Sequence, residues 1–529
     1  MPMVLVLLRM NIITYLPKQF SLTGVSFRQN KICRGLKNTG RYGLLLLISA
    51  FITVRSYARA PADSIDLFLI NKMQAMKIPG LQVAIIRQGK IIKLNQYGFA
   101  NLQDSVRVTD KTLFPINSIT KAFVGVAAMQ LVESGKLDLA APVSLYIDSL
   151  PAAWQKVTVR NLLTHTSGLP DIWGDSPVTE GTEKEAWQKT KAMPMDFNTG
   201  DRFSYNQTNY LLIGQIIDKL SGQPFSQFIQ ERQLQVASMK YTFFGDAHAV
   251  VANSARSYTF LHVINGKTQR TRDLGNVYEE VPPFLRTAAG MNSTARELAQ
   301  WLISLQNGQL LKNKASLDQL WNPGILNNGK QGGFSRFLNG YALGWPTISR
   351  PEHRAVAPVG GGRSAIFLYP DDDLAIIILT NLQACNPESF VDELAGYYFP
   401  DMKSANGFGL PPAIKAFRAK LLKRGFEKGS AIVKEEKKAN ASYELSEQDL
   451  NAWGYTLVEQ NKQKEAIEIF KLNVLLYPKS ANVYDSLAEM YADTGQKSLA
   501  IENYQRSLAL NPNNQNAKQM LVKLKEPAK

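Results

Sequence analysis

The residues best suited to chemistry lie in residues 114–123, FPINSITKAF, where Ser118 stands three positions before Lys121. The apolar and small residues that follow predict a helix, and a spacing of three places both side chains on one face of it. A lysine is rarely buried without a partner. A desolvated lysine loses its proton readily and can activate a serine hydroxyl for nucleophilic attack. The pattern therefore suggests covalent acyl transfer at Ser118.

The same spacing has a structural explanation. Ser118 can serve as the N-cap of the helix, where its hydroxyl satisfies a free backbone N–H. Lys121 can extend its apolar stem along the surface and keep its charge in water. Two fixed positions form a loose motif in a chain of 529 residues, so the choice between the two interpretations depends on the remaining sequence.

Composition and charge exclude several classes of protein. The formal net charge is +16, but residues 1–58 hold eight Lys and Arg residues and no acidic residue, and residues 401–445 contribute a further +5. No basic stripe with interleaved aromatic residues appears elsewhere, so nucleic-acid binding is not expected, whereas a loose association with an anionic membrane or wall surface is. Two cysteines and four scattered histidines give no disulfide framework and no metal-ligating cluster. No metal or other cofactor is expected.

Residues 1–58 are typical of a leader. Residues 42–54, YGLLLLISAFITV, are uncharged, apolar and flanked by arginines. This run is short for a transmembrane helix and suits the apolar region of a secretory signal peptide, with Ser56-Tyr57-Ala58 as its cleavage site. The mature protein is therefore expected to be exported, to a periplasm or to the extracellular space.

Residues 63–400 have the pattern of one domain. Two β-rich runs flank a turn at 88–90, and a second hairpin pattern near the other end has PDDD at its turn. Helical patterns predominate between them. Strands at both ends predict an α+β domain, in which one antiparallel β-sheet flanked by helices lies beside a helical subdomain. Residues 401–445, basic and carrying Pro411-Pro412, predict a linker with at most one helix.

Residues 446–529 show an internal repeat. EAIEIFKLNVLLYP ends at Pro478 and LAIENYQRSLALNP ends at Pro512, thirty-four residues later. This order of small, aromatic and proline positions resembles two tetratricopeptide repeats, which are all-α helix pairs, followed by a closing helix. The resemblance implies a docking surface for a protein partner. A helical hairpin that only caps the fold is the alternative.

Four further segments follow the Ser118 segment in a recognisable order. They are LLTHTSGLP (162–170), YNQTNYLLIGQII (205–217), RTAAGMNSTARELAQWL (286–302) and VAPVGGGRSAIFLYP (356–370). Together with S-x-x-K, these segments resemble the serine β-lactamase and D-alanyl-D-alanine peptidase superfamily, specifically its class C-like branch. The resemblance spans about residues 65–400 and implies a β-lactamase/transpeptidase-like fold.

The resemblance also implies roles for matching residues. Ser118 corresponds to the nucleophile that takes the acyl group, and Lys121 corresponds to the buried amine that holds the network around the hydroxyl proton. Tyr205 corresponds to the tyrosine that passes protons to and from the serine and the leaving group. The backbone N–H groups of Ser118 and Gly361 would stabilise the oxyanion, with Gly360 lining the same edge.

Several positions depart from the family or admit two roles. Gln207 stands where the family has the asparagine of Tyr-x-Asn, so its substrate contact could be displaced. Pro358 stands where the third motif has a charged residue that grips a substrate carboxylate. Arg363 could replace that contact as a bidentate clamp, or it could be a surface arginine on the strand. His165 is expected to brace its loop, because lysine already supplies a base.

These features predict an exported serine hydrolase that works through an acyl-enzyme at Ser118 on an amide or ester: a β-lactam, a D-amino-acid peptide or a small ester. The loss of charge at Pro358 favours esterase or peptidase activity over efficient β-lactam hydrolysis. The alternative is a catalytically weak or inactive β-lactamase-like binding protein that engages a protein partner through its repeats.

Overall fold

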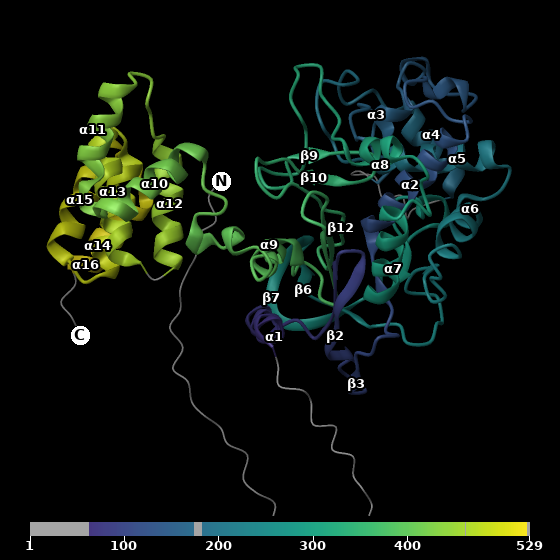
Figure 1. The fold of residues 1–529 in the computed structure, drawn as a ribbon, viewed down its shortest axis with the longest axis horizontal. Coiled ribbons are helices and arrows are strands. Elements are labelled where there is room, and N and C mark those ends of the chain that lie inside the picture. The colour runs from purple at the N-terminus through teal and green to yellow at the C-terminus, as the bar shows by residue number, and fades with distance from the viewer. Residues whose placement is uncertain (1–62, 174–181, 461, 526–529) are drawn as a thin grey trace, which may run out of the picture. The chain divides into compact units, whose positions relative to one another are not determined.

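A computed structural model describes residues 63–173, 182–460 and 462–525. The expected leader with its signal peptide lies outside these residues. The chain shown in Figure 1 forms an α+β part up to about residue 402 and an all-helical part from residue 412. Within the described residues, no helix combines the length and the apolar character required to cross a bilayer.

The α+β part is organised around one antiparallel sheet with the strand order β3-β2-β1-β14-β13-β11-β10-β9, and β12 pairs with β13 at the side of this path. β1, close to the start of the described chain, pairs along its length with β14 near residue 380. The ends of the domain therefore meet in the middle of the sheet, as the two hairpin patterns predicted. The strands are β1 (Gly80–Arg87), β2 (Lys90–Asn101), β3 (Val106–Arg107), β9 (Gly340–Tyr341), β10 (Pro346–Ile348), β11 (Ala355–Val356), β12 (Val359–Gly360), β13 (Ser364–Tyr369) and β14 (Leu374–Thr380).

Each face of the sheet is covered by helices. Val83 and Ile85 of β1 lie in one hydrophobic cluster with side chains of α1 (Ser64–Met76) and α9 (Val391–Ala395). Their neighbours Ala84 and Ile86 lie in a second cluster with α7 (Ala295–Gln306). Alternate residues of a strand point to opposite faces, so the apolar run from Val83 to Ile86 shows that β1 is buried on both sides.

The helical subdomain is built around α2 (Thr120–Glu133), whose residues are buried on nearly every side. A helix that is apolar all round must lie inside the molecule. Gly125 permits this packing, because a Cβ atom there would lie 1.9 Å from the Leu343 carbonyl oxygen. The other helices of this part are α3 (Val159–Leu163), α4 (Glu183–Ala192), α5 (Gln207–Ser221), α6 (Phe225–Ile229) and α8 (Lys314–Trp321).

Two small sheets complete the α+β part. One has the order β4-β8-β5, and the other is a hairpin of β6 and β7. The β8 strand leads directly into α7, which Thr294 caps by accepting a hydrogen bond from the Glu297 N–H. These strands are β4 (Phe114–Pro115), β5 (Phe243–Phe244), β6 (Ser257–Ile264), β7 (Lys267–Val277) and β8 (Met291–Ser293).

The C-terminal part contains seven helices among the described residues. They are α10 (Pro412–Arg424), α11 (Gly429–Ala439), α12 (Glu447–Glu459), α13 (Gln463–Leu476), α14 (Ala481–Asp493), α15 (Lys497–Leu510) and α16 (Gln515–Lys525). The segment 401–445 therefore holds two helices, where the sequence predicted a linker with at most one. Ile414, Phe417 and Ile432 of these helices are buried in the same hydrophobic cluster as Trp453 and Phe470. The helix pairs after residue 446 thus extend a core that begins before them.

Candidate active site

Ser118 lies in a 3-10 turn, Asn117–Ile119, immediately before α2. The helix itself begins at Thr120 and its N-cap is Ile119, so Ser118 is not the N-cap of α2. The Thr120 hydroxyl donates to the Asn117 carbonyl oxygen at 2.6 Å and closes this turn. Ser118 is partly exposed, whereas Lys121 is fully buried. Lys121 therefore does not snorkel to water.

The Lys121 amine has two protein acceptors. Its Nζ donates to the Gln207 Oε1 and to the Ala288 carbonyl oxygen, each at 2.8 Å. Burial lowers the pKa of Lys121 to about 7, and the Asp171 carboxylate opposes this shift only in part. A neutral amine has two N–H bonds and one lone pair. Because two acceptors occupy the two N–H bonds, the lone pair is available to accept a proton.

Tyr205 lies beside this amine. The Lys121 Nζ is 4.6 Å from the centroid of the Tyr205 ring. Burial raises the pKa of the Tyr205 phenol, and a hydrogen bond with Ser118 opposes that shift. The phenol is therefore protonated near neutral pH and lies within reach of the serine hydroxyl. Ser118 and Lys121, from one segment, and Tyr205, from a second segment far along the chain, meet at one place.

Asn206 and Gln207, the two residues after Tyr205, have different structural roles. Asn206 caps α5: its Oδ1 accepts from the Asn209 N–H at 3.1 Å, and its Nδ2 donates to the Leu169 carbonyl oxygen. Gln207, one residue later, supplies the amide that contacts Lys121. Its backbone N–H donates to the Asp171 Oδ1 at 2.8 Å. The longer side chain of glutamine reaches the amine, and no sequence pattern indicated that Asp171 anchors its backbone.

His165 is a structural residue of the loop behind Tyr205. Its Nδ1 accepts from the Asn206 N–H at 3.1 Å, and its ring centroid is 4.4 Å from that of Tyr205. Burial holds the pKa of His165 well below its usual value, and the nearby Lys121 acts in the same direction. The neutral imidazole thus orients its neighbours, which fits the expected bracing role.

The glycine segment, Gly360–Gly362, runs directly beside the serine turn, Asn117–Ile119. A Cβ atom on Gly360 would lie 2.0 Å from the Ile116 carbonyl oxygen and 3.3 Å from the Ser118 nitrogen. At Gly361, which has a left-handed φ of 58°, it would lie 2.9 Å from the Asn117 Cγ. Only glycine lets the two backbones approach this closely. The structure thus brings the Ser118 N–H and the Gly360–Gly361 backbone together.

Arg363 fits neither of the two roles expected from the sequence. It is fully buried, so it is not a surface arginine. Its Nη2 donates to the Glu279 Oε1 and its Nη1 donates to the Ser257 Oγ at 2.8 Å. A carboxylate of the protein itself occupies the guanidinium, which is therefore not free to clamp a substrate carboxylate. Pro358 is buried immediately before β12 and offers no side-chain donor.

This fold, with a serine, a desolvated lysine and a buried phenol beside two close backbones, defines the class of β-lactamase-fold serine hydrolases. The family model described as Beta-lactamase matches residues 66–396. The chain therefore belongs to the beta-lactamase family.

The chain is similar to several known proteins. Protein flp of Staphylococcus aureus (strain MW2) is 26% identical over 342 residues, which are 63% of this chain and 65% of the relative. A beta-lactamase of Providencia stuartii is 29% identical over 280 residues, 52% of this chain and 69% of the relative. The crystal structure of D-amino acid amidase from Ochrobactrum anthropi SV3 shares the fold, with a TM-score of 0.53 and 24% identity over 64% of this chain and 99% of that chain.

Proposed function

We propose that this chain is a serine hydrolase that cleaves an amide or ester through an acyl-enzyme at Ser118. The observation that carries the proposal is the bonding of Lys121. The neutral Lys121 amine donates its two N–H bonds to the Gln207 Oε1 and to the Ala288 carbonyl oxygen. Burial lowers its pKa to about 7. An amine in this state can act as a general base near neutral pH.

The reaction proceeds in two halves. In the first, Ser118 Oγ attacks the carbonyl carbon while its proton moves to the Lys121 lone pair, directly or through the Tyr205 phenol. Backbone N–H groups of Ser118 and Gly361 stabilise the oxyanion, and Tyr205 returns the proton to the leaving oxygen or nitrogen. In the second half, water attacks the acyl-enzyme along the same proton path and releases the acid and free Ser118.

The substrate is a neutral ester or short peptide in preference to a β-lactam that carries a carboxylate. Pro358 has no donor to offer such a carboxylate, and Arg363 is matched by Glu279. A charge-assisted hydrogen bond contributes about 1.5 to 3 kcal/mol. Its loss therefore weakens the binding of substrates that carry a carboxylate. The phenol of Tyr205 as proton carrier supports placement in the class C-like branch of the superfamily.

The remaining parts of the proposal concern the ends of the chain. The apolar run at 42–54, flanked by arginines, supports export to a periplasm or the extracellular space. The 34-residue period after residue 446 supports tetratricopeptide repeats that dock a protein partner. The basic side chains of 401–445 support a loose association with an anionic surface.

Labelling with a fluorophosphonate probe tests the proposed chemistry, because such a probe phosphonylates an activated serine and loses fluoride. The wild-type protein should carry one adduct, located at Ser118 by mass spectrometry, and Ser118→Ala should abolish it. Ser134→Ala, at the other end of α2, is the matched control and should label normally. An unlabelled wild-type protein, or a labelled Ser118→Ala protein, would refute the proposal.

A further inference from the structure

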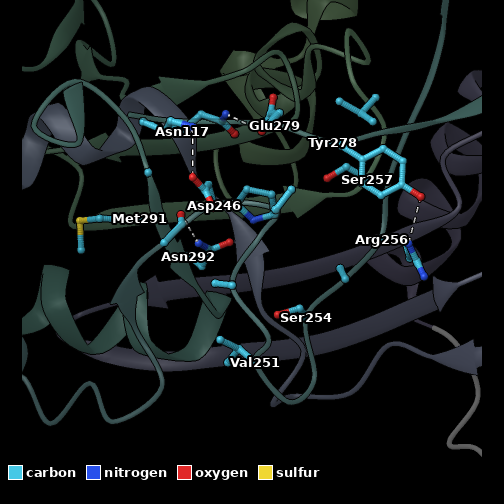
Figure 2. A pocket seen from close by; sticks show the side chains of 18 of the residues that line it. Asn117, Asp246, Val251, Ser254, Arg256, Ser257, Tyr278, Glu279, Met291 and Asn292 are labelled. Atoms are coloured by element: carbon cyan, nitrogen blue, oxygen red, sulfur yellow. Dashed lines mark hydrogen bonds between the residues drawn. The ribbon is translucent and has the colours of Figure 1, made fainter. Parts of the chain in front are cut away.

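The Glu279 carboxylate joins two segments that flank the reactive serine. One of its oxygens, Oε2, accepts from the Asn117 Nδ2 at 2.9 Å, and the other, Oε1, accepts from the Arg363 Nη2. Asn117 directly precedes Ser118, and Arg363 ends the glycine segment. Glu279 itself lies two residues after β7 (Lys267–Val277). Figure 2 shows Asn117 and Glu279 side by side on the wall of a cavity of about 360 Å³.

The Asn117 end of this bridge acts on the serine turn. Asn117 has a left-handed φ of 45°. Residues other than glycine adopt this conformation at a cost, which asparagine tolerates better than most, and such a conformation persists when surrounding contacts enforce it. The hydrogen bond from the Asn117 side chain to Glu279 is such a contact. A change in the Asn117 backbone would rotate the peptide that carries the Ser118 N–H.

The Arg363 end acts on the glycine segment. The Arg363 N–H donates to the Gly360 carbonyl oxygen at 3.0 Å and closes the turn through Gly361. A Cβ atom on Gly361 would lie 3.3 Å from the Arg363 Nε, so the arginine side chain lies against this turn. Its guanidinium is buried and its charge is matched by Glu279. Without that carboxylate the buried cation would have to move toward water.

We infer that Glu279 is a positioning residue that fixes the distance between the two backbone donors of the oxyanion site, the N–H groups of Ser118 and Gly361. This inference rests on the proposed serine hydrolase function. One carboxylate holds both sides of the site at once, and each of its oxygens serves one side. Oxyanion donors act through precise placement rather than through strong binding of the ground state. The loss of Glu279 therefore lowers kcat for acylation and leaves KM nearly unchanged.

Glu279→Gln is the primary test, and Glu280→Gln is its matched control. Both variants remove one carboxylate at adjacent positions, but Glu280 is exposed and pairs with His248. The glutamine oxygen can still accept from the Arg363 guanidinium, but the negative charge that matches this buried cation is lost. The glutamine NH2 group can satisfy Asn117 only if the Asn117 amide reverses and presents its Oδ1, so the variant weakens the bridge at one end and rearranges it at the other. We expect kcat for a p-nitrophenyl ester to fall about 10- to 100-fold in Glu279→Gln. Glu280→Gln should remain within about twofold of wild type.

A second readout separates positioning from simple loss of structure. A thionoester presents sulfur, a larger and weaker acceptor, to the oxyanion donors, so the ester-to-thionoester ratio of kcat/KM reports how well those donors are placed. The ratio should fall about fivefold or more in Glu279→Gln and stay constant in Glu280→Gln. If Glu279→Gln does not fold, Asn117→Ala provides the test. This variant removes the hydrogen bond between Asn117 and Glu279 and keeps the Arg363–Glu279 ion pair. It should lower kcat and the ratio in the same direction.

The outcomes distinguish the two proposals. A wild-type protein that neither labels nor turns over the ester refutes the hydrolase function itself. An active wild-type protein whose Glu279→Gln variant keeps its kcat and its ester-to-thionoester ratio overturns the positioning role alone. A folded Asn117→Ala variant with an unchanged ratio would overturn it as well.

Discussion

Lys121 is fully buried, and burial favours the neutral form of its amine. Its folded-state pKa, about 7, lies below the usual lysine value of 10.5 because burial penalises the charge. The unfolded chain therefore binds a proton between these pH values and the folded chain does not. The stability of the fold consequently rises with pH across this window, and the contribution is lost as the pH falls through about 7.

The same pKa sets the pH dependence of acylation. The rate of ester acylation should rise about tenfold per pH unit below pH 7 and level off above it, since only the neutral amine accepts the serine proton. Lys121→Arg keeps a charge that cannot be lost, so its acylation should fall by about 10²- to 10⁴-fold. The measurement is kcat/KM for a p-nitrophenyl ester between pH 5 and 9. A flat profile, or an active Lys121→Arg variant, would contradict the role of the lysine.

Pro358 leaves the site without a side-chain donor for a substrate carboxylate. Nitrocefin carries a carboxylate, and a neutral p-nitrophenyl ester of similar size does not. The missing contact of about 1.5 to 3 kcal/mol corresponds to a roughly 10- to 100-fold lower kcat/KM for the lactam. Pro358→His should recover part of this difference and leave the ester rate unchanged. Equal rates for both substrates in the wild-type protein would show that a carboxylate is recognised elsewhere.

The sequence indicated some site residues and could not indicate others. Ser118 and Lys121 stand in one motif, and Tyr205 stands in one of the segments that follow it in the order of the family. Local patterns were therefore sufficient to predict these three residues. Glu279 contacts Asn117 across 162 positions and Arg363 across 84. No local pattern records such pairs. The sequence therefore left Arg363 as either a clamp or a surface residue, whereas the fold buries it.

The strand β12 and the serine turn lie in close backbone contact. Gly360→Ala would place a Cβ atom 2.0 Å from the Ile116 carbonyl oxygen, which is backbone and cannot move aside freely. The strand must then shift away from Ser118, and acylation should fall by about 100-fold or more. Fluorophosphonate labelling rates measure this effect.

A glycine substitution elsewhere gives the control for this experiment. Gly429 begins α11, and its added Cβ would meet a leucine methyl group at 3.3 Å, a neighbour that can adjust. Gly429→Ala should therefore label at the wild-type rate. Wild-type labelling of Gly360→Ala would mean that the glycine segment does not contribute to the site.

Element boundaries show where sequence patterns were insufficient. The apolar strands near both ends of the domain were predicted because their β-rich runs are long and bounded by turns. The sequence predicted a linker with at most one helix where α10 and α11 lie, because basic residues and two prolines resemble a linker. Pro412 is the first residue of α10, a position where proline is well tolerated because the N–H it lacks would have no helical partner. Buried Phe417 and Ile432 then join these helices to the following core.

At the scale of the whole molecule, the described chain has separate hydrophobic cores. The residues of the C-terminal cluster, including its partly buried members, all lie between 410 and 524, and those of the sheet and its helical subdomain all lie before 409. A core that is complete within a continuous stretch of chain can fold by itself. Phe408 follows the α+β part and still packs against its core, with its ring centroid 4.6 Å from the Arg350 guanidinium.

A protein ending at Leu410 should therefore keep the site. It retains the full sheet, the serine turn and Phe408, and it lacks all helices from α10 onward. We expect its fluorophosphonate labelling rate and its kcat for a p-nitrophenyl ester to stay within about twofold of the full chain, because loss of a separate core leaves distant contacts unchanged. A protein ending at Ala395 is the control: it loses Phe399, Met402 and Phe408, which pack against the sheet, and should unfold at a lower temperature. Insolubility or loss of labelling in the protein that ends at Leu410, with the full chain active, would show that the C-terminal helices complete the hydrolase core.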